Sequence, residues 1–379
     1  MRKFIGQFFI TTALTEVSLV YPVHFYAVHH SLLLLGLITA LYNGLNGIGS
    51  YLWGLILDSM KTRKGLLIVL SSMGAMSGAV YSFNGLIGYS MIGFISALDA
   101  PLYSLVLLET MTEDDLVRGN SVLSEISLAG NIAGSILASV YPNPLVVIGL
   151  FLVSLVFNML FVPSYDGRTN ANRKEMMNDL KGLYYPVISY FAFNLSAELF
   201  FTVYVPLNYD MGNPEYVVFL SYTILYLVDE FVYNKAVSMI KGKEIKYIYL
   251  SIVGRAVISL ALALLVVSQL KIGLGIVGFF MAFGPIFPVY STAFFSVVVK
   301  GLKRNRATML GLLNSAEDIA SIIGGLAVGV AETLFGAYMM SFYALAIAMF
   351  SFSAYLSLKR LQSKPVSPQE KKEYTQASS

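Results

Sequence analysis

The chain has 379 residues, of which 56% are apolar and 12% are charged, with a net charge of +3 and no cysteine. This composition, with a mean hydropathy of +0.70, exceeds what a soluble core needs and predicts an integral membrane protein. The sequence lacks a phosphate-binding loop, an HExxH motif and cysteine ligands, so we expect no cofactor, no bound metal and no enzymatic activity. We also expect no nucleic-acid partner, because loops between membrane spans account for most basic residues.

Apolar segments long enough to cross a bilayer, about 20 residues each, recur along the whole chain. Six precede a polar segment near the middle of the sequence, and six follow it. We therefore expect an all-α integral membrane protein with twelve transmembrane helices in two six-helix halves. The predicted spans are 4–28, 32–57, 65–83, 85–110, 119–141, 144–163, 184–207, 215–240, 245–269, 272–299, 307–334 and 337–358.

The longest polar segment divides the chain. It predicts an N-terminal six-helix bundle over 1–163, a cytoplasmic central loop over 164–182 and a C-terminal six-helix bundle over 183–362. The residues that follow, 363–379, are rich in Ser, Gln, Lys and Glu, a composition typical of a disordered tail.

The basic residues indicate how the spans cross the membrane. With twelve spans, 22 of the 25 Lys and Arg residues fall on the side that holds the N-terminus, and only Lys271 falls in a loop on the other side. Short loops rich in Lys and Arg stay in the cytoplasm. We therefore expect a multi-pass protein of the cell (inner or plasma) membrane with both termini cytoplasmic, surrounded by lipid and working as a monomer.

A short basic loop joins the second and third predicted spans and reads Gly54-Leu-Ile-Leu-Asp58-Ser-Met-Lys-Thr-Arg63-Lys64. With the six-plus-six arrangement, it resembles the GxxxDRxGRR/K signature of the major facilitator superfamily of secondary transporters at Gly54, Asp58 and the basic pair. The resemblance implies a small-molecule substrate and alternating access, in which two halves rock around a central site. The superfamily also has an antiporter signature that contains a proline. It resembles Gly130-xxx-Gly134 of this chain, which lacks that proline.

Small-residue motifs also relate the two halves. Gly130 and Gly134 in the fifth span correspond to Gly325 and Gly329 in the eleventh, and each span begins at a basic residue. Such GxxxG faces let membrane helices approach closely, and similar motifs at equivalent places indicate an internal repeat. A chance match is the alternative in a glycine-rich chain.

Three carboxylates lie near the middle of predicted spans: Glu16, Asp99 and Glu198. A charge inside the bilayer costs about 2.5–3.5 kcal/mol or more and marks a transport pathway by default. The resemblance implies that spans 1, 4, 7 and 10 line the cavity, and burial favours the protonated form of a carboxylate. Each of the three is therefore a candidate proton carrier; the alternative is a structural partnership with a Tyr or Asn. The full candidate set for a proton and substrate cavity is Glu16, His24, Asp99, Tyr103, Asn194 and Glu198.

A second set of residues is predicted at the cytoplasmic ends of spans 2, 3 and 11. Asp58 ends the second span, where it can face basic residues or the positive end of a neighbouring helix. These residues are predicted to form a latch that holds one transport state. The alternative, for the basic residues, is that they only anchor the loop on the cytoplasmic side. The predicted gating and latch residues are Gly54, Asp58, Arg63, Lys64, Glu317 and Asp318.

Two further features concern the second half. Asp229 and Arg255 each lie 13 residues from the expected turn at Gly242, so we expect them, with Glu230, to form a structural ion pair at one depth. Pro285 and Pro288 lie within the tenth span, and prolines bend a helix. They predict a kink that serves either as a gating hinge or as a static bend.

These features predict secondary active transport of a small solute, coupled to protons, with efflux of amphipathic or cationic compounds as one form. Alternatives are a proton-independent uniporter, an importer of an organic solute, and a membrane sensor without transport.

Overall fold

The computed structural model describes residues 2–110, 113–164, 184–268, 270–301, 306–335, 347–348 and 351. The central segment 165–183, most of the predicted twelfth span (337–358) and the tail lie outside the described residues. The first half contains η1 (Arg2–Phe4), α1 (Ile5–His29), α2 (Leu32–Ser59), α3 (Arg63–Phe83), α4 (Gly85–Thr110), α5 (Glu113–Val140) and α6 (Pro144–Phe161). The second contains α8 (Tyr184–Asp210), α9 (Glu215–Ile240), α10 (Glu244–Val267), α11 (Gly275–Phe283), α12 (Ile286–Gly301) and α13 (Arg306–Phe335).

The described helices match the first eleven predicted spans to within a few residues, apart from the start of α5. Ten helical segments of the described chain are long and apolar enough to cross a membrane. Polar residues mark the turns between them: the Ser31 side chain accepts a hydrogen bond from the Leu34 amide at the start of α2. Asn143 accepts one from the Leu145 amide at the start of α6, where Pro144 takes the first helical position. Both are typical N-caps.

The tenth predicted span, 272–299, is not one helix. It divides into α11 and α12 at Gly284 and Pro285, because proline has no amide hydrogen and its ring blocks a continuous helix. The backbone crosses the break in a tighter turn, in which the Phe287 amide donates to the Gly284 carbonyl over 2.8 Å. The predicted interruption is confirmed, whereas its use as a hinge remains a proposal.

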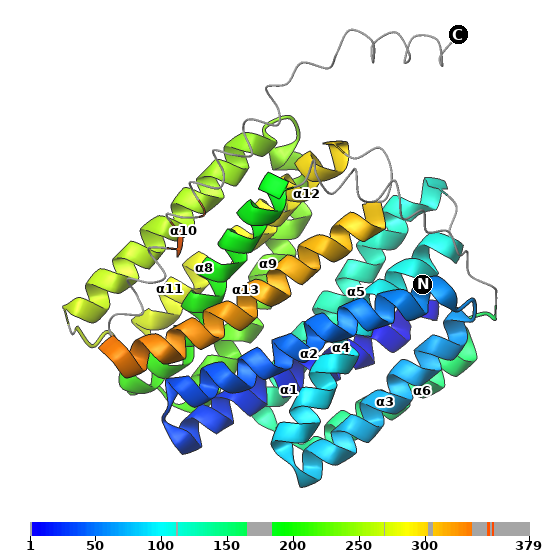
Figure 1. The fold of residues 1–379 in the computed structure, drawn as a ribbon, viewed down its shortest axis with the longest axis horizontal. Coiled ribbons are helices and arrows are strands. Elements are labelled where there is room, and N and C mark those ends of the chain that lie inside the picture. Colours follow the sequence, from blue (N-terminus) through cyan, green and yellow to red (C-terminus); the bar gives the residue numbers. More distant parts are fainter. Residues whose placement is uncertain are drawn as a thin grey trace, which may run out of the picture.

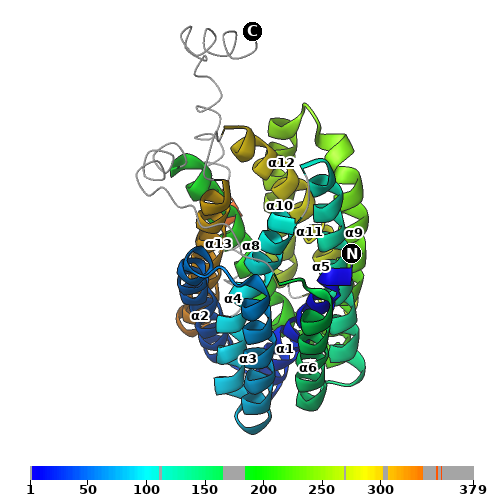
Figure 2. The same cartoon turned by 90° about the vertical axis from the view of Figure 1, so that its right-hand side faces the viewer.

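Helices α1–α6 and α8–α13 form two bundles that lie next to each other (Figure 1). The bundles meet along α2 and α13, which run side by side through the centre of the view, and along α5 and α9 (Figures 1 and 2). We call the end of the molecule where α1 begins the proximal end and the end where α1 finishes the distal end.

Glycines allow α2 and α13 to touch backbone to backbone. A Cβ atom added at Gly36 would collide with the Gly325 carbonyl oxygen, and one added at Gly329 would lie 2.6 Å from the Leu33 Cα. On α5, a Cβ at Gly134 would lie 2.5 Å from the Thr12 carbonyl oxygen of α1. Both GxxxG motifs therefore pack closely as predicted, one between the halves and one within the first half.

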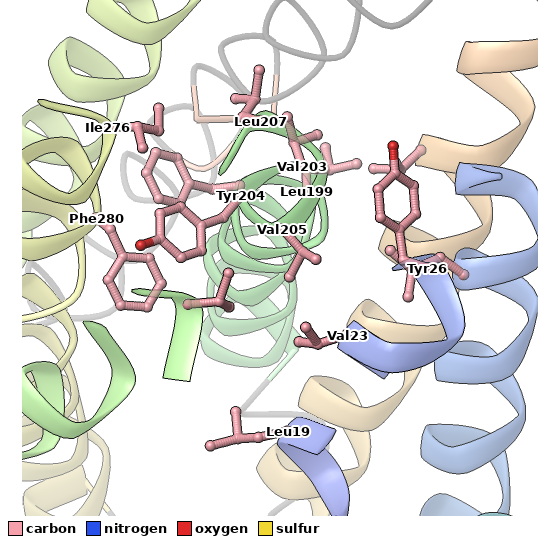
Figure 3. Close-up of a cluster of buried hydrophobic side chains, with 14 of the residues drawn as sticks. Leu19, Val23, Tyr26, Leu199, Val203, Tyr204, Val205, Leu207, Ile276 and Phe280 are labelled. Carbon is pink, nitrogen blue, oxygen red and sulfur yellow. The ribbon is translucent and has the colours of Figure 1, made fainter. Parts of the chain in front are cut away.

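The buried apolar side chains form one shared cluster and two separate ones. The shared cluster joins α1 and α2 to α8, α9 and α11, and Figure 3 shows Val23 and Tyr26 of α1 on one side with Val203 and Tyr204 of α8 and Phe280 of α11 on the other. The other two clusters each belong to a single half. The described part of the chain thus has its apolar connection between halves toward the distal end.

The close crossing of α2 and α13 predicts a strong effect of one methyl group. Gly36→Ala places a methyl group against the Gly325 carbonyl, so the helices must separate, at a cost of about 1–3 kcal/mol. We expect a lower apparent melting temperature in detergent. Gly44→Ala on the same helix is the matched control, because its Cβ would meet only Ile322 Cδ1 at 3.8 Å. Equal melting temperatures for the two variants would contradict this packing.

Candidate functional site

A cavity of about 280 Å³ lies between the two halves. Helices α1, α2 and α4 supply one side, and α8 and α9 supply the other. Its lining includes one carboxylate, several hydroxyl groups and a set of aromatic rings. The lining residues are Ser18, Leu19, Pro22, Val23, Leu35, Thr39, Tyr42, Asn43, Tyr89, Glu198, Phe201, Thr202, Val205 and Tyr222.

Glu198 is the carboxylate of this cavity. It is partly buried on α8, and its Oε1 accepts a hydrogen bond from Thr202 Oγ1 over 3.3 Å, one turn further along the helix. On its other side it packs against α13, where a Cβ added at Gly324 would lie 2.8 Å from the Glu198 Cβ. Gly324 therefore leaves room for the aliphatic part of the Glu198 side chain, and packing against α13 determines the position of that side chain.

The cavity is closed toward the distal end by contacts between the halves. The Tyr26 and Tyr209 rings lie 5.8 Å apart above it, within the shared apolar cluster seen in Figure 3. A carboxylate oxygen of Glu332 on α13 accepts a hydrogen bond from the Leu32 amide at the start of α2, over 2.9 Å. This contact also satisfies a free amide at the positive end of α2.

The other two intramembrane carboxylates do not line the cavity. Asp99 is buried on α4 beside Thr11 of α1, and its Oδ1 has no hydrogen-bond partner among the described residues. Glu16 is buried on α1, where its Oε1 accepts a hydrogen bond from the Asn143 amide over 3.1 Å. That amide precedes α6, so Glu16 lies at the positive end of a helix. Of the three carboxylates expected in one cavity, only Glu198 lines it.

Three further residues expected in the cavity lie elsewhere. His24 is exposed on α1, because it follows the cavity-facing Pro22 and Val23 and the helix has turned away. Tyr103 is fully buried inside the first half and donates to Asn158 Oδ1 over 2.9 Å. Asn194 is buried on α8 and donates to the Tyr190 carbonyl of its own helix over 3.0 Å.

The predicted latch contains a buried ion pair that the sequence did not indicate. Arg63, only 1% exposed, meets the Glu109 carboxylate of α4 at 2.9 Å. It also donates to the carbonyls of Leu57 and Met60, at 2.6 and 2.9 Å. Arg63 therefore ties the start of α3 to the ends of α2 and α4, within one half.

The other latch residues do not gather at one place. Gly54 and Lys64 are partly buried, and the Asp58 side chain lies outside what the structure describes. Glu317 faces the second half and accepts a hydrogen bond from Tyr190 over 2.8 Å. Asp318 faces α2 instead, where a Cβ at Gly47 would lie 3.5 Å from the Asp318 Cβ. Gly47 lies 11 residues before Asp58 on α2, about 16 Å along the helix, so Asp318 does not meet the basic loop as expected.

The expected ion pair between Asp229 and Arg255 is not formed. Neither residue takes part in a salt bridge within the described chain, and Asp229 Oδ1 has no hydrogen-bond partner there. The buried Arg255 guanidinium instead lies over the rings of Phe193 and Phe283, at 4.0 and 4.4 Å. Equal depth across a hairpin placed the two residues near each other, but the aromatic rings hold the cation. Glu230 of the predicted pair is partly buried on α9.

Several cavity residues carry a signal that the sequence did contain. On α2, Leu35, Thr39, Tyr42 and Asn43 are spaced by four, three and one residues, which puts them on one helix face. On α8, Glu198, Phe201, Thr202 and Val205 are spaced by three, one and three residues, which also puts them on one helix face. A search for uncharged polar stripes, rather than for charges alone, would have found the α2 wall.

Two helical bundles with a cavity between them are the architecture expected of a membrane transporter. A family model of the Major Facilitator Superfamily matches residues 4–325, so the chain belongs to this superfamily, and its relatives are transporters rather than enzymes.

Two solved structures share the fold. The crystal structure of a D-xylose-proton symporter aligns with a TM-score of 0.72 at 12% identity and covers 93% of this chain and 96% of its own. The structure of the human organic anion transporter MFSD10 (TETRAN) aligns with a TM-score of 0.67 at 16% identity and covers 93% of this chain and 98% of its own. No curated protein matches the sequence.

The Arg63 contacts predict a large loss of stability on removal of one partner. Arg63→Met leaves the Glu109 carboxylate without its main counter-charge, and breaking a buried pair costs about 3–5 kcal/mol. We expect a marked fall in the apparent melting temperature. The double variant Arg63→Met/Glu109→Leu should recover part of the loss, because no buried charge is left behind.

Lys64→Met is the matched control, since Lys64 is partly buried and forms no salt bridge in the described chain. A double variant that is no more stable than Arg63→Met would contradict the pairing.

Proposed function

We propose that this protein is a secondary active transporter of a small solute, that the cavity between its halves is the transport site, and that Glu198 carries the coupled proton. The observation behind this proposal is a cavity that both halves line and whose described lining holds a single carboxylate. A site near the interface of two repeats is where alternating access exposes a substrate to each side in turn.

The distribution of apolar contacts supports alternating access. The halves share one apolar cluster toward the distal end, whereas the two remaining clusters are separate. The Lys and Arg bias supports an orientation with the distal end outside the cell and both termini in the cytoplasm. On that orientation this state is closed to the outside, and separation of α1 from α8 at Tyr26 and Tyr209 opens it.

Glu198 suits proton coupling because its two protonation states differ greatly in cost. A charged carboxylate is costly in a partly enclosed, mostly apolar cavity, whereas a protonated carboxyl group is tolerated there. Opening to water on either side lets the proton leave. Thr202 donates to the carboxylate, which stabilises the charged form once the cavity is wet. Asp99 and Glu16, which lie within the packing of the first half, serve its structure in this proposal.

The structural neighbours limit the choice of substrate only loosely. D-xylose with a proton and organic anions are the substrates in their titles. An organic anion would meet Glu198 without a Lys, Arg or His among the described lining residues, so anion transport does not fit this cavity. Proton-independent uniport and sensing without flux are the competing functions. We propose that the protein works as a monomer in the cell membrane.

A pH gradient across proteoliposomes tests the proton coupling. A pH-sensitive dye inside reports proton movement when a solute is added, with phenyltrimethylammonium, D-xylose and benzoate as the first three probes. We expect at least one solute to move protons and expect Glu198→Gln to reduce that signal about tenfold or more, because glutamine cannot exchange a proton.

Glu16→Gln and Asp99→Asn are the matched controls, as carboxylates of the same membrane that lie outside the cavity, and both should keep the signal. Solute flux that ignores the pH gradient would show uniport. Loss of the signal in Asp99→Asn but not in Glu198→Gln would move the proton site to the first half.

A further inference from the structure

Charge in the cavity has one sign. Glu198 is the only described lining residue that can carry a formal charge near neutral pH. In a mostly apolar cavity, Coulomb forces are strong because little water screens them. A cation therefore balances the deprotonated carboxylate, and an anion is repelled by it.

Aromatic rings line the cavity from both halves. Tyr42 comes from α2, and Phe201 and Tyr222 come from α8 and α9; all three are partly buried. A ring presents a negative face that attracts a cation, and quaternary ammonium groups are recognised in this way.

These rings are held in place by their neighbours. Tyr42 ends a stack, with ring centroids 4.6 Å from Tyr89, which in turn lies 4.6 Å from Tyr21. Phe201 meets Phe280 edge-on at 5.5 Å. Rings fixed before a ligand arrives lose little entropy on binding.

The three small hydroxyl groups of the cavity, on Ser18, Thr39 and Thr202, already donate hydrogen bonds within the protein. Ser18 donates to the Thr15 carbonyl over 3.1 Å and Thr39 to the Leu35 carbonyl over 3.0 Å. Thr202 donates to Glu198. A neutral polyol needs donors and acceptors for each of its hydroxyls, and these three donors are engaged. An ammonium group needs only acceptors and ring faces.

We propose that the cavity binds a small monovalent organic cation with a quaternary or protonated ammonium group. Its charge pairs with Glu198, while Tyr42 and Tyr222 face it from the two halves. A volume of about 280 Å³ lies near the small end of ligand sites, which suits a single-ring cation. This inference rests on the proposed function of the cavity and adds its substrate class.

The proposal implies an exchange. A protonated Glu198 has no charge to offer, so an arriving cation binds as the carboxyl group releases its proton, and one positive charge replaces another. The O–H bond of Glu198 breaks, the proton passes to water, and the cation pairs with the carboxylate. Cation and proton then move in opposite directions, one for one, and the cation's affinity rises with pH until Glu198 is fully deprotonated.

Two molecules of the same shape separate the effect of charge on affinity from the effect of size. Phenyltrimethylammonium and tert-butylbenzene differ by a nitrogen and its positive charge. We expect the cation to bind the purified protein in detergent, by calorimetry, about tenfold or more tightly than the neutral isostere. Binding in weak buffer should release a proton that a pH indicator detects. Equal affinity for both molecules, or no binding of the cation, overturns the proposal.

Variants separate the contribution of the Glu198 carboxylate to cation binding from that of the aromatic rings. Glu198→Gln should reduce cation affinity about tenfold or more and abolish proton release, while leaving the affinity for tert-butylbenzene near its original value. Tyr42→Leu should reduce cation affinity more than Tyr42→Phe does, because phenylalanine keeps the ring face. Melting temperatures show that each variant is folded. Equal cation affinity in Tyr42→Leu and the parent protein rules out the aromatic contribution.

The outcomes separate this inference from the proposed function. Cation binding without proton release supports the substrate class and contradicts the proton coupling. Proton movement driven by D-xylose, without cation binding, keeps the coupling and removes the substrate class. Cation binding that persists unchanged in Glu198→Gln places the site elsewhere and overturns the proposal.

Discussion

The contact between α2 and α13 is the constraint on which the arrangement of this protein depends. Lipid tails are as apolar as the surface of a membrane helix, so the hydrophobic effect does not drive helices together. Their contacts depend on close packing and on polar groups. Gly36, Gly325 and Gly329 supply that packing by letting the backbones touch. Because α13 also packs against α8 at Gly324 and Glu198, the interface between the halves determines where the cavity carboxylate lies.

The molecule places buried charge in three different ways. Arg63 meets Glu109 and two backbone carbonyls, so its charge and most of its donors are satisfied. Arg255 lies over two phenylalanine rings, whose faces partly replace a counter-ion. Glu198 has neither arrangement: it borders the cavity, and the hydroxyl groups of Thr202 and Ser321 are its hydrogen-bond donors. A carboxylate that borders the cavity with only hydroxyl donors around it can exchange partners, and Glu198 holds this position between the halves.

The same interface connects binding to conformational change. The cavity walls come from both halves, so a ligand that contacts α2 and α8 together favours their approach. The shared apolar cluster and the contact of Glu332 with the start of α2 hold the distal end together. Opening that end exposes apolar side chains and breaks one charge-assisted hydrogen bond. In the proposed alternating mechanism, contacts that form at the opposite end offset both costs.

The sequence by itself determined the class of the protein, the positions of the first eleven spans and the break at Pro285, because each depends on local properties: apolar length, turn residues and the missing proline amide. It also indicated the close-packing glycines and the depth of the intramembrane charges. Only the tertiary structure decided which side each charge faces. Glu16 lies at the start of α6, Tyr103 pairs with Asn158, and Arg255 meets rings instead of Asp229. Depth is counted along one helix, but a cavity is defined by the rotation of five helices about their axes, and packing between helices far apart in the chain fixes that rotation.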